Sequence, residues 1–96
     1  GPGPRSTARE SRYSASDQSQ ELLEEMDTDR LRRMTENVRR LRQSGHLRSG
    51  VTLSQAADVL WTYSSPELYE LLVLRRGWPV KRYGRFVADA MIDALL

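Results

Sequence analysis

The most regular pattern in this sequence runs through its last residues, 80–96. Apolar residues recur there at the three- and four-residue spacing of one helix face, and charged residues occupy the opposite side. A pattern of this period fits an amphipathic helix and excludes a half-buried strand. The apolar face consists of Tyr83, Phe86, Val87, Ala90, Met91, Ala94 and Leu95.

Three earlier segments carry helix start and stop signals. We expect a first helix over Asp17–Ser44, where Asp17 and Gln20 resemble a capping box and Gly45 suits a left-handed end. A second helix should start at the capping box of Thr52 and Gln55 and end at Ser64. A third should follow Ser65-Pro66, with Pro66 as its first residue, and stop at Gly77. Since this third segment is apolar on nearly every side, we expect it to be buried.

The whole pattern predicts an all-α fold. No period-two alternation and no Asn-Gly or Asp-Gly turn occurs. We expect residues 1–16 to form a flexible tail, because their polar composition buries too little surface to offset ordering. Residues 17–96 should form one domain, an antiparallel bundle of about four helices.

Composition excludes several classes of protein. The net charge of +2 comes from 15 basic and 13 acidic residues, a balance too even to predict nucleic-acid binding. The longest apolar run, Leu71–Leu74, is far shorter than the roughly 20 residues that span a bilayer, and no signal-peptide pattern is present. We therefore expect a cytoplasmic protein without membrane partners.

Residues suited to catalysis are sparse. The single histidine, His46, has no carboxylate beside it in the sequence, and there is no cysteine. Ser64 and Ser65 are explained by helix capping. We therefore expect no catalytic residues, no metal site and no cofactor, and interpret the chain as something other than an enzyme. The Arg-rich segment Arg30–Arg42 is best interpreted as a solvated helix face, with direct nucleic-acid binding as an alternative.

The order of residues in the second half resembles a known family. Segments with plausible spacing and in the correct order are similar to the C-terminal region of TetR/AcrR-type bacterial transcriptional regulators, and the resemblance extends over about Asp17–Leu96. These segments are Leu47–Thr52, Ala56–Trp61, Ser64–Tyr69, Gly77-Trp78 and Arg82-Tyr83.

The resemblance implies a homodimeric repressor whose C-terminal domain binds a small apolar or aromatic effector and dimerises through a four-helix bundle. It places the effector pocket at Met34, Val38, Leu41, Trp61, Tyr63 and Tyr69. It places the dimer interface at Ala57, Leu60, Tyr83, Phe86, Val87, Ala90, Met91 and Ala94.

Two departures from the family pattern change these expectations. Nothing before Asp17 has a helix-turn-helix pattern, so we expect a fragment or truncated product that reaches DNA only through a domain outside this chain. Helices that normally complete the effector pocket are also missing from the pattern. An alternative interpretation is a stand-alone helical module that binds a partner protein or peptide.

Overall fold

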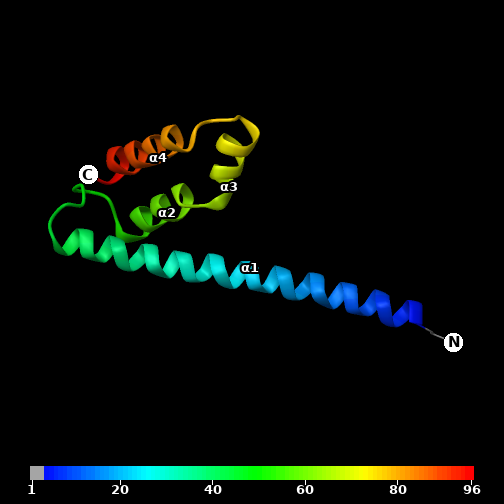
Figure 1. Ribbon diagram of the computed structural model, residues 1–96. Helices are drawn as coiled ribbons and strands as arrows, with labels where there is room; N and C mark the ends of the chain where they lie inside the picture. Colours follow the sequence, from blue (N-terminus) through cyan, green and yellow to red (C-terminus); the bar gives the residue numbers. More distant parts are fainter. Residues whose placement is uncertain (1–3) are drawn as a thin grey trace. The chain divides into compact units, whose positions relative to one another are not determined.

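The chain is helical in the computed structural model, which describes the backbone of residues 4–96 and the side chains of residues 17–96. Its elements are α1 (Pro4–Gln43), α2 (Leu53–Tyr63), α3 (Pro66–Tyr69), the π-helix η1 (Glu70–Arg75) and α4 (Val80–Leu95) (Figure 1). The described backbone contains no strand. The predicted all-α class is confirmed. No helix in the described part of the chain combines the length and apolar character needed to cross a bilayer.

The first helix starts earlier than predicted. It begins at Pro4 and continues through Asp17 without a break, so the predicted start at Asp17 is wrong. Residues 5–16 contain neither glycine nor proline, and Pro4 occupies the first helical position, where a missing N–H is tolerated. The predicted tail therefore has helical backbone from Pro4 onwards, while its flexibility stays a prediction. Residues 1–3 of that tail lie outside the described residues.

The chain divides into two compact units, one ending at Arg30 and one spanning Leu31–Leu96. The first unit is helical throughout its described backbone. Among its described side chains, those of residues 17–30, the exposed large apolar ones are Leu22, Leu23 and Met26, which are 56%, 62% and 57% exposed. The second unit contains the end of α1 together with all later elements.

The end of α1 and the start of α2 follow local rules. Gly45 adopts a positive φ of 78°, as predicted for a left-handed helix end, and the His46 amide donates to the Leu41 carbonyl at 3.1 Å. At α2 the Gln55 amide donates to the Thr52 hydroxyl and the Thr52 amide donates to the Gln55 side chain, both at 3.1 Å. The predicted capping box is confirmed, because both of its reciprocal bonds are present.

The third helical segment starts as predicted but differs in form and burial. Pro66 is the first residue of α3 after Ser65, although the Ser65 side chain forms no capping hydrogen bond. The segment then widens into η1, and the Arg76 amide donates to the Leu71 carbonyl at 3.1 Å, a π-type spacing. Gly77, with φ of 72°, ends it. The predicted burial is wrong, since Leu71 and Leu74 are 49% and 67% exposed.

A small core holds the second unit together. Its buried residues come from three helices: Val38 of α1, Ala56 and Ala57 of α2, and Leu95 of α4. Alanine at two of these positions lets α2 and α4 approach closely, and these helices pack against each other (Figure 1). The Arg48 amide donates to the Leu95 carbonyl at 2.6 Å, which joins the loop before α2 to the end of α4.

Candidate interaction surfaces

Aromatic side chains gather where α2, η1 and α4 approach one another. The Phe86 ring lies edge-on to Tyr63 at 6.5 Å between ring centroids and to Trp78 at 5.5 Å. The Arg82 guanidinium lies 3.8 Å from the centroid of the Trp78 ring, within cation–π range. These contacts hold the turn between η1 and α4 against α2, and Phe86 still leaves 41% of its surface exposed. We call Tyr63, Trp78, Arg82 and Phe86 the aromatic corner.

A second contact between aromatic rings joins α3 to α4. Tyr69 at the end of α3 and Tyr83 of α4 meet edge-on, with centroids 5.4 Å apart. Tyr69 is 37% exposed, whereas Tyr83 and Trp61 are half-buried. The sequence shows that these residues are aromatic. Which rings pair with each other depends on the geometry of the turn between η1 and α4 and could not be predicted from the sequence. The four-residue spacing of Trp78 and Arg82 was the local signal that could have predicted the cation–π contact.

The residues predicted to line an effector pocket are distributed between core and surface. Val38 is fully buried in the core, and Leu41 packs against that core. Met34, Trp61 and Tyr63 are half-buried. Of these, Tyr63 takes part in the aromatic corner, while Met34 lines a separate hollow along α1. The effector pocket stays a prediction.

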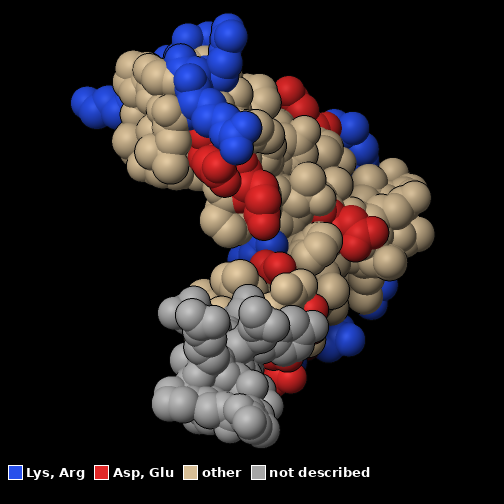
Figure 2. All heavy atoms as spheres, turned by 90° about the vertical axis from the view of Figure 1, so that its right-hand side faces the viewer, with Lys and Arg blue, Asp and Glu red and all other residues tan. Residues whose placement is uncertain are grey.

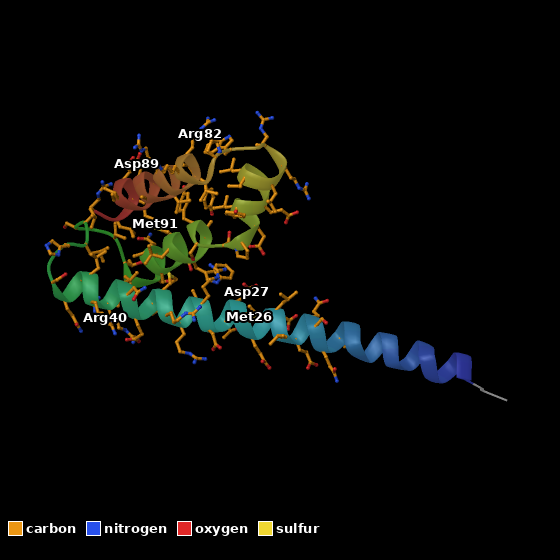
Figure 3. All side chains as sticks on the ribbon, viewed as in Figure 1. Met26, Asp27, Arg40, Arg82, Asp89 and Met91 are labelled. Carbon is orange, nitrogen blue, oxygen red and sulfur yellow. The ribbon has the colours of Figure 1, made fainter. Side chains whose placement is uncertain are left out.

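An open hollow of about 410 Å³ lies along the basic face of α1 in the second unit. Glu36 of this face pairs with Arg39, whereas Arg33 and Arg40 form no ion pair with any residue that the structure describes. Figure 3 shows Arg40 on the side of α1 that points away from α2 and α4. The hollow is lined by Arg32, Arg33, Met34, Glu36, Asn37 and Arg40. We call these six residues the Arg hollow.

The residues predicted to form a dimer interface are exposed to different degrees. Ala57 is only 4% exposed and belongs to the core of its own chain. Figure 3 shows Met91 on the side of α4 that faces α2, and Arg82 and Asp89 on the opposite side. Phe86 is the most exposed of the predicted set. The half-buried members are Leu60, Tyr83, Val87, Ala90, Met91 and Ala94.

A second basic surface occupies the turn between η1 and α4. Figure 2 shows basic side chains gathered at the top of the view, over this turn. Arg76, Lys81 and Arg85 are exposed there, and Arg75 pairs with Glu70 at 3.1 Å. This surface and the Arg hollow are separate concentrations of positive charge within the second unit.

Groups suited to metal binding do not converge in the part of the chain with described side chains. Among residues 17–96 no three His, Asp or Glu side chains are placed to hold a metal ion. The exposed His46 ring lies with Nδ1 3.0 Å from the Ser44 hydroxyl, at the end of α1. His46 lies in the loop between α1 and α2.

Comparison with known protein families, with curated proteins and with solved structures gave no match for this chain.

Proposed function

We propose that this chain is the effector-binding and homodimerisation region of a TetR/AcrR-type transcriptional regulator. Operator DNA would be bound by a helix-turn-helix domain outside this chain. The proposal draws on the order of residues from Leu47 to Tyr83 and on the helix boundaries that those residues set. Such a regulator releases or binds DNA when an effector changes the arrangement of its two subunits.

The observation that best supports the proposal is that the apolar face of α4 is only partly buried. Its apolar stripe is regular, yet Leu95 is its only buried residue and Phe86 remains 41% exposed. An apolar helix face left at a surface commonly marks a protein interface. A second copy that laid its own α2 and α4 against this face would cover it in a four-helix bundle.

The proposed two-fold interface is centred on Phe86 and Ala90, which lie one helix turn apart on α4. A small side chain beside an aromatic ring lets two helices approach and gives the ring a place to pack. Ala57 is better explained by the chain's own core than by the interface, because only 4% of it is exposed. The effector would enter beside Tyr63 and Tyr69, where aromatic faces are available for a flat apolar molecule.

The test is the mass in solution of two matched variants. Ala90→Glu should convert a dimer to a monomer, because a carboxylate at the two-fold axis is desolvated next to its symmetry mate. Ala88→Glu makes the same change at an exposed position of the same helix and should leave the dimer intact. Light scattering during gel filtration measures both masses. A wild-type chain that is monomeric at micromolar concentration with full helicity would refute the proposal.

A second candidate function, a helical module that binds a partner protein, is favoured by η1. Leu71 and Leu74 project apolar surface from a short segment without being covered, and Phe86 adds an exposed ring on α4. An amphipathic partner helix could bind such a surface. Leu71→Ser together with Leu74→Ser would abolish partner binding in this case, whereas the homodimer proposed above would survive these changes.

A further inference from the structure

Within α1, residues 17–42 divide sharply by charge into an acidic half, Asp17–Asp29, and a basic half, Arg30–Arg42. Every charged residue from Asp17 to Asp29 is acidic, whereas every charged residue from Arg30 to Arg42 except Glu36 is an arginine. Opposite charges three or four residues apart along one helix can pair locally, as Arg30 does with Asp27 at 3.4 Å. Charges grouped in separate halves leave most of the acidic side chains without a local cation.

The acidic half combines its charge with exposed apolar surface. Leu22, Leu23 and Met26 are each more than half exposed, and they are interspersed with Glu21, Glu24 and Glu25. None of these three glutamates forms an ion pair with any residue that the structure describes. An exposed helical segment with leucines flanked by carboxylates is suited to a basic surface that also has an apolar centre.

The Arg hollow is such a surface. Met34 supplies its apolar part, and Arg33 and Arg40 lie on it without an ion-pair partner among the described residues. It belongs to the second unit, and Arg40 points away from the core helices α2 and α4 (Figure 3). The volume of about 410 Å³ is large enough for one or two leucine-sized side chains.

We propose that the segment Asp17–Asp29 of one copy binds in the Arg hollow of a second copy of this chain. The two surfaces match in both charge and apolar content, and every copy carries both. An antiparallel crossing that sets Leu23 of one copy beside Met34 of the other brings Glu24 towards Arg33 and Asp17 towards Arg40. The contact uses none of the residues of the α4 interface proposed above, so it stands independently of that proposal.

Disulfide capture tests this contact directly, because the natural chain has no cysteine. A chain carrying Leu23→Cys is mixed with a chain carrying Met34→Cys under mild oxidation. A disulfide needs Cβ atoms within about 4.5 Å of each other. Because the proposed crossing sets residue 23 of one copy beside residue 34 of the other, the mixed disulfide should form readily. The Leu23→Cys chain alone should cross-link much more slowly, because Leu23 faces Met34 of the second copy and not its own counterpart. Equal rates in the two samples would overturn the proposal.

Charge reversal provides a second test of the same contact. Adding Arg33→Glu and Arg40→Glu to the Met34→Cys chain should slow cross-linking about tenfold, since exposed ion pairs contribute modestly and are replaced by repulsion. Adding Asp17→Arg and Glu24→Arg to the Leu23→Cys chain should then restore the rate in the mixture of the two reversed chains. Salt should slow the unreversed pair. If the singly reversed mixture cross-links as fast as the unreversed one, the contact does not exist.

Controls separate this contact from the other surfaces. Arg76→Glu with Arg85→Glu reverses the basic surface at the turn between η1 and α4 and should leave cross-linking unchanged. Ala90→Glu should also leave it unchanged, even where it dissociates the α4 dimer, so failure of either proposal can be recognised. Circular dichroism checks that each variant stays helical. Should a reversed chain lose helicity, the neutral Arg33→Gln and Arg40→Gln pair gives the same test with a smaller reduction in rate.

Discussion

Replacing Val38 by alanine should weaken the second unit more than any other conservative change. Val38 is the largest fully buried side chain in the part of the structure that is described. It also joins α1 to Ala56 and Ala57 of α2 and to Leu95 of α4. In a core of four buried residues, one side chain provides a large share of the apolar contact between these helices.

The expected loss can be estimated from the groups removed. Two methyl groups contribute about 1.6 kcal/mol at roughly 0.8 kcal/mol each. A cavity of about 50 Å³, if it does not collapse, adds roughly 1.2 kcal/mol. Alanine is the better helix former by about 0.5 kcal/mol, which offsets part of this loss. The net destabilisation of Val38→Ala is therefore about 2 kcal/mol, or a fall in melting temperature of roughly 10 °C.

Urea unfolding followed by circular dichroism, at one fixed protein concentration, measures this change in the free energy of unfolding. The control is Val80→Ala, which removes the same groups from a side chain that is 59% exposed at the start of α4. Its effect should stay below about 0.5 kcal/mol. Equal effects of the two substitutions would refute the view that Val38 holds α1 to the other helices.

Three further substitutions test local features of the second unit by the same measurement, and a fourth tests a helical glycine. Thr52→Ala removes the capping bond to the Gln55 amide and should destabilise by about 1 kcal/mol; no change would mean that α2 does not depend on its cap. Phe86→Ala removes two edge-to-face contacts and should destabilise by about 2 kcal/mol, with a shift in Trp78 fluorescence as a second readout. Gly77→Ala places a side chain at φ of 72° and should destabilise by about 1 kcal/mol. Gly84→Ala should instead stabilise by up to about 1 kcal/mol, because no atom lies within 4 Å of the added Cβ apart from its chain neighbours and the nearby backbone of its own helix; a loss of stability or of the proposed dimer would indicate that Gly84 is a close contact between subunits.

Helix ends were predictable wherever a short-range bond sets them. The reciprocal bonds of Thr52 and Gln55, the fixed φ of Pro66 and the positive φ of Gly45 and Gly77 all depend on residues within one helix turn. The start of α1 was harder, because Asp17 offers a favourable cap that the structure does not use. A cap signal indicates where a helix can begin and does not prevent an earlier start.

Burial depends on contacts between segments that are distant in the sequence. Leu71 and Leu74 form an apolar run that indicated a buried helix, yet both are about half or more exposed. Composition reports how apolar a segment is and carries no information about what covers it. The π-helical form of η1 was not indicated by the sequence pattern, and beyond its end the Trp78 amide donates to the Leu72 carbonyl at 2.9 Å. The Arg hollow was visible in the sequence only as a charged face.

The hydrogen bond from the Arg48 amide to the Leu95 carbonyl can be used to measure how often α4 separates from the rest of the second unit. The two residues are brought together only when the last helix is docked, so this amide is shielded from solvent deuterium only in that state. Amides inside helices can exchange through fraying of a single helix, whereas this one exchanges when the tertiary contact itself is lost. Its exchange rate therefore reports the free energy of undocking α4.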